Sequence, residues 1–308
     1  MTDPLAHALV ESFDAIFGSN PGARAAHAKG TSCDATFVAT PAAASLTRAL
    51  HLQGDPIPAI VRFSNGSGNP AASDSGREPR GMSVKFHLPD GNATDLVAIN
   101  HPVFIVRTPE EFLEFMRLRA PDPATGQPDF AKLIEFVSAR PESQRAAEIL
   151  LNAPPIASFL RANYFPIHAY RFIAPDRTER AIRYRWESSL GIETLTTEEA
   201  AARDPDYLRA DLLERLSRGP VTFTLTVQIA GPDDDPSDPT TEWPDDRDRI
   251  TIGHLEIGGP CADQAATEAM VFDPMRLCDG IRASKDPVLK ARARAYLVSS
   301  ERRLSPAP

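Results

Sequence analysis

The chain contains few cysteines, and their positions fit no site. Only three occur in 308 residues, namely Cys33, Cys261 and Cys278, and no pair of them has the CxxC spacing. An odd number of widely spaced cysteines indicates neither a disulfide framework nor a zinc site. A reducing compartment is the simplest setting for such a chain, so we expect a cytoplasmic protein.

Long apolar runs and an excess of basic side chains are also missing. No stretch approaches the roughly 18 uninterrupted apolar residues that a membrane-spanning helix needs, and the N-terminal segment lacks the basic start of a signal peptide. Lys and Arg total 33 against 42 Asp and Glu, which gives a net charge of -9. Nucleic acids and anionic membranes attract concentrated positive charge, so the sequence predicts neither as a partner.

Several segments have the period-two alternation of half-buried strands. In the clearest, 222–231, the apolar residues Phe223, Leu225 and Val227 alternate with threonines. The alternation changes phase near Gly253, which indicates a bulge at a barrel corner. Further strands are expected at 36–40, 57–66, 81–88, 94–104, 180–187 and 249–257.

Helical patterns interrupt these strands. An N-terminal helix is expected over 3–17, with Asp3 as its cap, and further helices over 108–120, 129–140, 206–219 and after Pro287. Thr108 and Glu111 have the spacing of a capping box. The mixture predicts an α+β fold, not alternating βαβ units.

The C-terminal helix carries an arginine and a tyrosine that could form a ligand pair for a metal centre. Arg292 and Tyr296 are four residues apart and therefore share one helix face. A guanidinium beside a phenol favours the phenolate, and a tyrosinate can be the axial ligand of a haem iron. The alternative is an amphipathic core tyrosine with its hydroxyl at the rim, and the spacing alone leaves both open.

Six segments, taken in order along the chain, resemble those of the haem catalase family. The segment that holds Arg292 and Tyr296, "FDPMRLCDGIRASKDPVLKARARAY", resembles the proximal haem segment. The other five matching segments are "RAAHAKG", "VRFS", "RGMSVKF", "DLVAINHPVF" and "DPTTEWP". Together they extend over residues 24–303, so the resemblance implies a catalase-like antiparallel β-barrel with surrounding helices.

The resemblance implies a catalytic role for three residues. His27 would take a proton from a peroxide on the distal haem face and deliver it to the leaving oxygen. Ser64 would hold the other ring nitrogen of His27 and fix its tautomer. Asn100 would orient the peroxide by a hydrogen bond.

The same resemblance implies a set of cofactor-binding residues for haem b, iron protoporphyrin IX. Tyr296 would be the axial ligand of the haem iron, with Arg292 beside it. Arg24 and Arg62 are the candidates for pairing with the propionates, and Arg303, on the same helical face as Tyr296, is a further one. None of the three cysteines falls at the ligand position, which makes a thiolate ligand the less favoured choice.

Departures from the family pattern point to a small form of the fold. Ala25 and Ala26 stand where catalases usually carry valines, and Ile105 replaces a second phenylalanine, so the pocket gains room. The segment after Tyr296 lacks residues typical of large catalases, and their C-terminal helical domain is expected to be absent. We expect one haem-binding domain over 1–308, with a barrel core at about 24–260 and the ligand helix at about 286–303.

With these departures, the sequence most resembles the small catalase-related peroxidases. They imply a haem-dependent peroxidase that acts on hydrogen peroxide or organic hydroperoxides with small organic donors, has weak catalase activity and contributes to the oxidative stress response. An allene oxide synthase-like isomerase of fatty-acid hydroperoxides and a non-catalytic haem-binding protein are the alternatives. The expected assembly is a monomer or small homo-oligomer.

Overall fold

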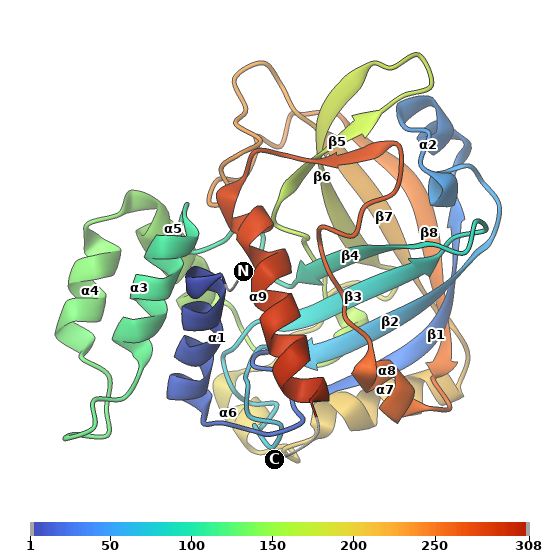
Figure 1. The fold of residues 1–308 in the computed structure, drawn as a ribbon. Helices are drawn as coiled ribbons and strands as arrows, with labels where there is room; N and C mark the ends of the chain where they lie inside the picture. Colours follow the sequence, from blue (N-terminus) through green and yellow to red (C-terminus); the bar gives the residue numbers. More distant parts are fainter. Residues whose placement is uncertain (1–2, 306–308) are drawn as a thin grey trace.

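One curled antiparallel sheet lies at the centre of the computed structural model, which describes residues 3–305 (Figure 1). Across these residues, nine strands are hydrogen-bonded in the order β4-β3-β2-β1-β8-β7-β6-β5-β9. The strands are β1 (Gly30–Ala39), β2 (Ile57–Asn65), β3 (Arg80–His87), β4 (Ala93–Ile99), β5 (Ala169–Ile173), β6 (Glu179–Ser188), β7 (Val221–Ile229), β8 (Arg249–Pro260) and β9 (Ile281–Ala283).

Helices surround this sheet. The α-helices of the described residues are α1 (Pro4–Phe17), α2 (Pro41–Leu46), α3 (Pro109–Arg119), α4 (Phe130–Ser138), α5 (Pro141–Asn152), α6 (Thr197–Ala201), α7 (Tyr207–Ser217), α8 (Gln264–Ala269) and α9 (Pro287–Leu304). Two short 3-10 helices, η1 (Leu50–Leu52) and η2 (Phe159–Arg161), complete the set. None of the helices within residues 3–305 is both long and apolar enough to cross a bilayer.

The interior of the curled sheet is filled by aromatic side chains from strands that are not neighbours. Phe37 of β1 meets Trp186 of β6 edge-to-face with 6.3 Å between ring centroids, and Phe63 of β2 lies 6.3 Å from Phe223 of β7. All four side chains have no exposed surface. The sheet therefore curls into a barrel around a packed core, in which edge-to-face aromatic pairs are favourable.

The structure confirms the predicted strand bulge, the two predicted helix caps and the fold class. Beside Gly253, the pairing of β7 with β8 shifts register between Leu225 and Thr226, which is the expected bulge. Asp3 caps α1 by accepting hydrogen bonds from the first turn, and the capping box of Thr108 and Glu111 opens α3. The α+β class and the barrel are likewise as predicted.

Some boundaries and elements differ from the sequence-based expectations. The strand expected over 94–104 ends at Ile99, because the Asn100 side chain takes the next hydrogen bond from the backbone and Pro102 has no N–H to extend the ladder. The short strands β5 and β9 and the helix α5 were not expected. Their apolar patterns are short or irregular, and β9 pairs with β5 more than 100 residues away in the sequence.

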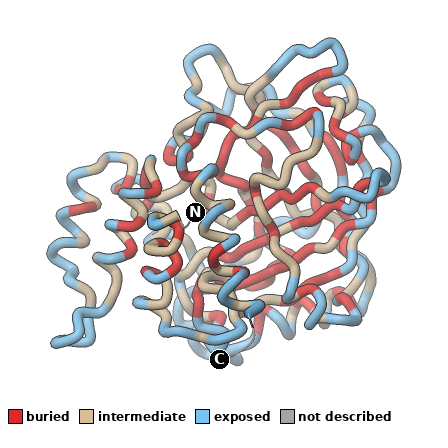
Figure 2. The backbone as a smooth tube through the Cα atoms, viewed as in Figure 1, coloured by how far each residue is buried: buried red, intermediate tan, exposed pale blue. Residues whose placement is uncertain are grey.

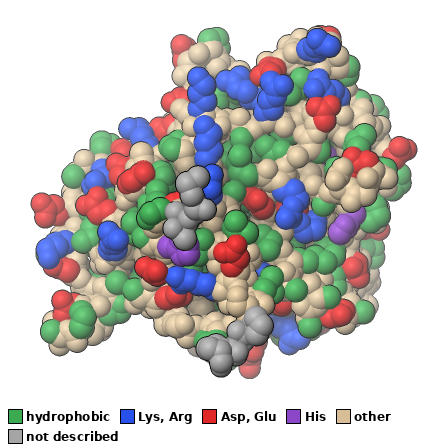
Figure 3. Space-filling view, viewed as in Figure 1, with side chains coloured by type: hydrophobic (Ala, Val, Ile, Leu, Met, Phe, Trp, Pro, Cys, Tyr) green, Lys and Arg blue, Asp and Glu red, His purple; other side chains and the backbone are tan. Residues whose placement is uncertain are grey.

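The last helix, α9, lies in front of β2, β3 and β4, and the first helix, α1, lies beside it (Figure 1). α1 packs against both α3 and α9, with Ala6, Val10 and Val298 forming a small apolar cluster between the first and last helices. The helices α3, α4 and α5 stand beside the barrel, and much of their surface is exposed or only partly buried (Figure 2). Acidic and basic side chains are interspersed over the face drawn in Figure 3.

The start of α9 is fixed by a fully buried pair of side chains, Asp286 and His168. Asp286 accepts hydrogen bonds from the amides of Val288 (2.8 Å) and Leu289 (3.2 Å) through Oδ1. Its other oxygen, Oδ2, lies 2.6 Å from Nδ1 of His168. Neither side chain is exposed by more than 1%. The carboxylate thus caps the helix and provides a hydrogen-bond partner for Nδ1 of the histidine.

Replacing Asp286 by Ala should lower the free energy of unfolding by about 2–4 kcal/mol, because it removes a helix cap and leaves a buried imidazole without its partner. Urea unfolding followed by circular dichroism measures the loss. The matched control is Asp263→Ala, which removes the exposed cap of α8 and should cost about 1 kcal/mol or less. An equal loss in the two variants would contradict this account of the buried pair.

Candidate active site

The segment that carries His27 precedes β1 and has an unusual backbone. His27 has a φ of 57°, in the left-handed region that few non-glycine residues adopt. Its amide donates to the carbonyl of Gly66 (3.3 Å), and the next amide, of Ala28, donates to the carbonyl of Ser67 (3.0 Å). These bonds to the end of β2 hold the histidine against the sheet.

The imidazole of His27 packs against two small residues, Ser64 and Gly81. His27 Nδ1 lies 3.0 Å from Ser64 Oγ, as the resemblance implied. Gly81 stands beside them in β3, and a Cβ at this position would lie 2.6 Å from Ser64 Oγ and 2.9 Å from His27 Nδ1. Gly81 is therefore required by the site, and the signal for it was a glycine inside a strand pattern.

His27 is an uncharged base in this setting. Burial, followed by the positive charges of Arg62 and Arg292, lowers the pKa of His27 to about 3. The imidazole is therefore neutral at pH 7. No hydrogen bond to its Nε2 comes from residues 3–305, and His27 lines the cavity described below.

On α9 the arginine and the tyrosine are in direct contact. Arg292 donates to Tyr296 Oη from Nε (3.1 Å) and from Nη2 (2.6 Å). Burial lowers the pKa of Arg292, but Tyr296, with smaller contributions from Tyr170 and Asp286, raises it above its ordinary value. Two such donors on one oxygen are the partners that an ionised phenol takes.

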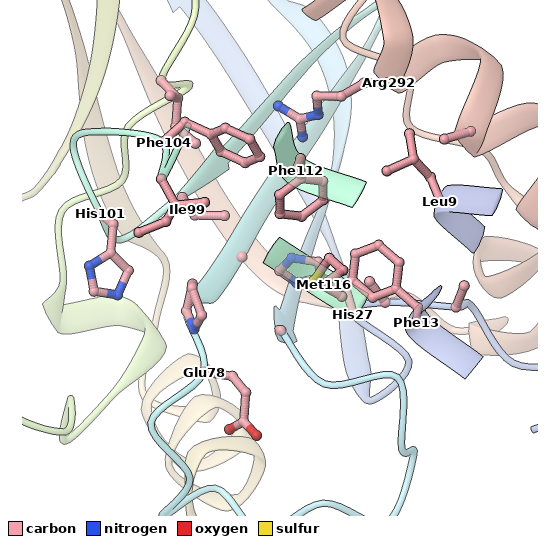
Figure 4. A pocket seen from close by; sticks show the side chains of 18 of the residues that line it. Leu9, Phe13, His27, Glu78, Ile99, His101, Phe104, Phe112, Met116 and Arg292 are labelled. Carbon is pink, nitrogen blue, oxygen red and sulfur yellow. The ribbon is translucent and has the colours of Figure 1, made fainter. Parts of the chain in front are cut away.

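A cavity of about 740 Å³ separates these groups (Figure 4). Its wall includes His27 and Ser64 on the sheet side and Arg292 and Tyr296 on α9. Most of the remaining wall is apolar, with aromatic side chains from α1 and α3. This volume and lining are typical of a cofactor or ligand site.

Three arginines converge at one end of the cavity. Arg62 donates to Glu268 Oε1 from Nε (2.7 Å) and to the carbonyl of His27 from Nη1 (3.0 Å). Arg24 also pairs with the Glu268 carboxylate, and Arg303 donates to the Glu268 backbone carbonyl. Burial, reinforced by the charge of Arg62, lowers the pKa of Arg24 to about 9. All three arginines were predicted, but Glu268 was not, because a glutamate in a short helix carries no motif.

The charges at this end fit the acidic side of a haem. Three guanidinium groups face one carboxylate, which leaves two positive charges, and haem carries two propionates. The Arg303 Nε is buried and has no hydrogen-bond partner among residues 3–305, so it is a donor that a propionate could use. Together with the apolar walls and the tyrosine, the donor set fits this cofactor.

The structure does not place Asn100 in the cavity, which corrects one expected position. Asn100 Oδ1 accepts the amide of Arg80 at 2.7 Å, and Asn100 is not among the residues that line the cavity. Its neighbours Ile99 and His101 do line the cavity. The reason is register: Ile99 pairs with Gly81 across β3 and β4, so Ile99 shares the face that holds His27.

Two histidines near the site had no expected role. His101 lines the cavity, and burial, together with the charge of Arg80, lowers its pKa to about 4. His168 lies under the start of α9 with Asp286, and its Nε2 is buried without a hydrogen-bond partner among the described residues. Neither position could be distinguished from an ordinary structural histidine in the sequence.

Comparison with known proteins agrees with this architecture. The family model described as Catalase matches residues 8–307. The chain is 40% identical over 294 residues to a catalase-related peroxidase of Mycolicibacterium paratuberculosis, and the match covers 94% of this chain and 92% of that protein. A catalase-related peroxidase of Synechococcus elongatus is 34% identical over 296 residues, with 96% and 87% covered.

Solved catalase structures share the fold. The structure of a bacterial catalase superposes with a TM-score of 0.84 at 25% identity, covering 96% of this chain and 60% of that one. Catalase A from Saccharomyces cerevisiae gives a TM-score of 0.82 at 25% identity, with 96% and 64% covered. The small chain thus corresponds to the core of these larger proteins. Members of this family generally bind haem, and the present chain belongs to the catalase family.

Proposed function

We propose that this member of the catalase family is a haem b-dependent peroxidase that reduces hydrogen peroxide or organic hydroperoxides and oxidises small organic donors, with weak catalase activity. The observation that carries the proposal is the uncharged His27 on one wall of the cavity and the Arg292–Tyr296 pair on another. A positioned base can move the proton of a peroxide, and a tyrosine oxygen is the haem-iron ligand that catalases use.

The residues that would hold the cofactor divide into two groups. Tyr296 would be the ligand of the haem iron, with Arg292 stabilising its ionised oxygen. Arg24, Arg62 and Arg303 would bind the propionates through charge-assisted hydrogen bonds. When bound, haem supplies the two electrons that split the O–O bond and recovers them from the donor, so that ROOH, two electrons and two protons give ROH and water.

His27 would move the proton in this reaction. With Nδ1–H donating to Ser64 Oγ, the lone pair on Nε2 accepts the proton of the hydroperoxide and returns it to the leaving oxygen. Because burial lowers the pKa of His27 to about 3, the imidazole is unprotonated throughout the neutral range and Nε2 keeps its lone pair available. Gly81 supports this role by leaving space for the ring and for Ser64.

The roomy and apolar cavity favours organic reactants. Ala25 and Ala26 line it near His27, and Ile99 occupies the wall beside Gly81. Such a pocket admits donors that a narrow channel excludes, which favours the peroxidase over the catalase reaction. The same room supports a second candidate, the isomerisation of a lipid hydroperoxide without a donor, and product analysis separates the two.

A steady-state assay with hydrogen peroxide and a phenolic or azo-type donor tests the proposed reaction. Donor oxidation should exceed oxygen release, because the open cavity gives the donor access to the site. Oxygen release measured with an electrode and donor oxidation measured by absorbance are compared on one preparation. Abundant oxygen without donor oxidation would refute the preference, and donor-independent conversion of a lipid hydroperoxide would favour the isomerase.

Replacing His27 by Asn should slow the reaction with peroxide by about a hundred- to ten-thousand-fold, because the positioned base is lost. Asparagine tolerates the left-handed backbone of this position, so the fold should be kept. Stopped-flow absorbance after mixing with peroxide gives the rate. The control His254→Asn changes an exposed histidine of β8 and should leave the rate unaltered. A wild-type rate in His27→Asn would remove the role of His27.

A further inference from the structure

One face of α3 lines the cavity and ends in a positive charge. Pro109, Phe112, Met116 and Arg119 recur at helical spacing and all belong to the cavity wall. Arg119 is the last residue of the helix and lies about 10 Å along the helix axis from Phe112, at about 1.5 Å per residue. The cavity therefore has an apolar stretch with a guanidinium at its end.

Arg119 has no acidic partner among residues 3–305. Its guanidinium contacts Met116 Sδ, 3.8 Å from Nη1, and the ring of Phe115, whose centroid is 5.6 Å from the guanidinium carbon. Burial lowers the pKa of Arg119, with the charge of Glu78 acting in the opposite direction. A guanidinium in such surroundings carries an uncompensated desolvation cost.

The neighbouring walls are apolar. Figure 4 shows Phe112 and Met116 of α3 facing the space that also holds His27 and Phe13. Further out, α4 and α5 contribute apolar side chains to the same wall, namely Leu133, Ile134, Val137, Ile149, Leu150 and Leu151. Ile134 and Leu151 are 65% and 64% exposed, so this arm of the cavity reaches the surface.

We propose that Arg119 binds the carboxylate of an organic hydroperoxide with an apolar body, such as a fatty-acid hydroperoxide, whose chain lies along α3 and whose peroxide reaches His27. The assignment rests on the proposed function and names its substrate class. A carboxylate matches the guanidinium in charge and can accept two parallel hydrogen bonds from it. The apolar wall between Arg119 and the histidine matches a hydrocarbon chain.

Two other charged residues line this part of the cavity. Glu78 forms no ion pair with Arg119 in the described part of the chain, but its charge is close enough to raise the pKa of that guanidinium. Arg77 is exposed and donates to the carbonyl of Leu151 at 3.1 Å, which places it at the outer rim. Each suggests an alternative to the proposal. Arg119 could serve only to neutralise Glu78, or Arg77 could be the residue that binds the substrate carboxylate.

The test compares a fatty-acid hydroperoxide with its methyl ester on the holoenzyme. The wild type should have a kcat/KM at least about tenfold higher for the acid, the expected worth of one charge-assisted interaction. In Arg119→Gln the acid-to-ester ratio should fall to near one, and Arg119→Lys should keep part of it. Arg117→Gln, an exposed change on the opposite side of α3, should retain the wild-type ratio.

Three results would overturn the assignment. A wild-type ratio near one excludes a carboxylate anchor, and loss of the ratio in Arg77→Gln but not in Arg119→Gln moves the anchor to the rim. If Arg119 only neutralises Glu78, Arg119→Gln reduces turnover of acid and ester equally and the ratio is unchanged.

A binding measurement separates this proposal from the proposed function. Isothermal titration of the holoenzyme with dodecanoate and with dodecanol needs no turnover. Dodecanoate should bind about tenfold more tightly than dodecanol to the wild type, and the two dissociation constants should be equal in Arg119→Gln. If the wild type oxidises no donor with any hydroperoxide, the peroxidase function fails while this measurement still decides the role of Arg119. Equal binding of dodecanoate to the wild type and Arg119→Gln would contradict that role.

Discussion

Positive charge gathered around one cavity is the constraint on which the rest of the site depends. Burial is the largest cause of the lowered pKa of His27, and the charges of Arg62, Arg292 and Arg24 lower it further. The guanidinium groups that can bind anions thus add to the effect of burial in keeping the histidine uncharged. An imidazole in a neutral environment would be partly protonated near pH 6.5. In the proposed function, the arginines that would bind the cofactor would therefore also help to keep the base uncharged.

The fold brings the two halves of this site together from opposite ends of the chain. His27 precedes the first strand, and Tyr296 belongs to the last helix. α1 and α9 hold these ends side by side through a small apolar cluster and through ion pairs of Arg302 with Glu11 and Asp14. The buried Asp286 fixes the start of α9, and the barrel gives a rigid wall on the other side.

The sequence predicted what local patterns encode. The caps of α1 and α3, the alternation of β7 and the bulge beside Gly253 follow from neighbouring residues, and the structure has them all. The positions of His27, Ser64 and the Arg292–Tyr296 pair followed from the catalase resemblance, and their contacts agree with it. Their catalytic roles are proposals.

The errors and omissions have a common cause in long-range geometry. Whether Ile99 or Asn100 faces the cavity depends on the register of β3 with β4, and a shift of one residue reverses the face. Glu268 meets Arg24 across more than 240 positions of the sequence, and Gly81 matters only because His27 folds onto it. That Arg119 has no acidic partner within residues 3–305 likewise depends on which helices surround it.

The optical spectrum of the purified ferric protein, recorded beside that of Tyr296→Phe, tests the central claim most directly. The account predicts a haem spectrum with the features of a phenolate ligand in the wild type and the loss of those features, or of the pigment, in the variant. A colourless wild-type protein given excess haem, or a spectrum that the substitution leaves unchanged, would contradict it.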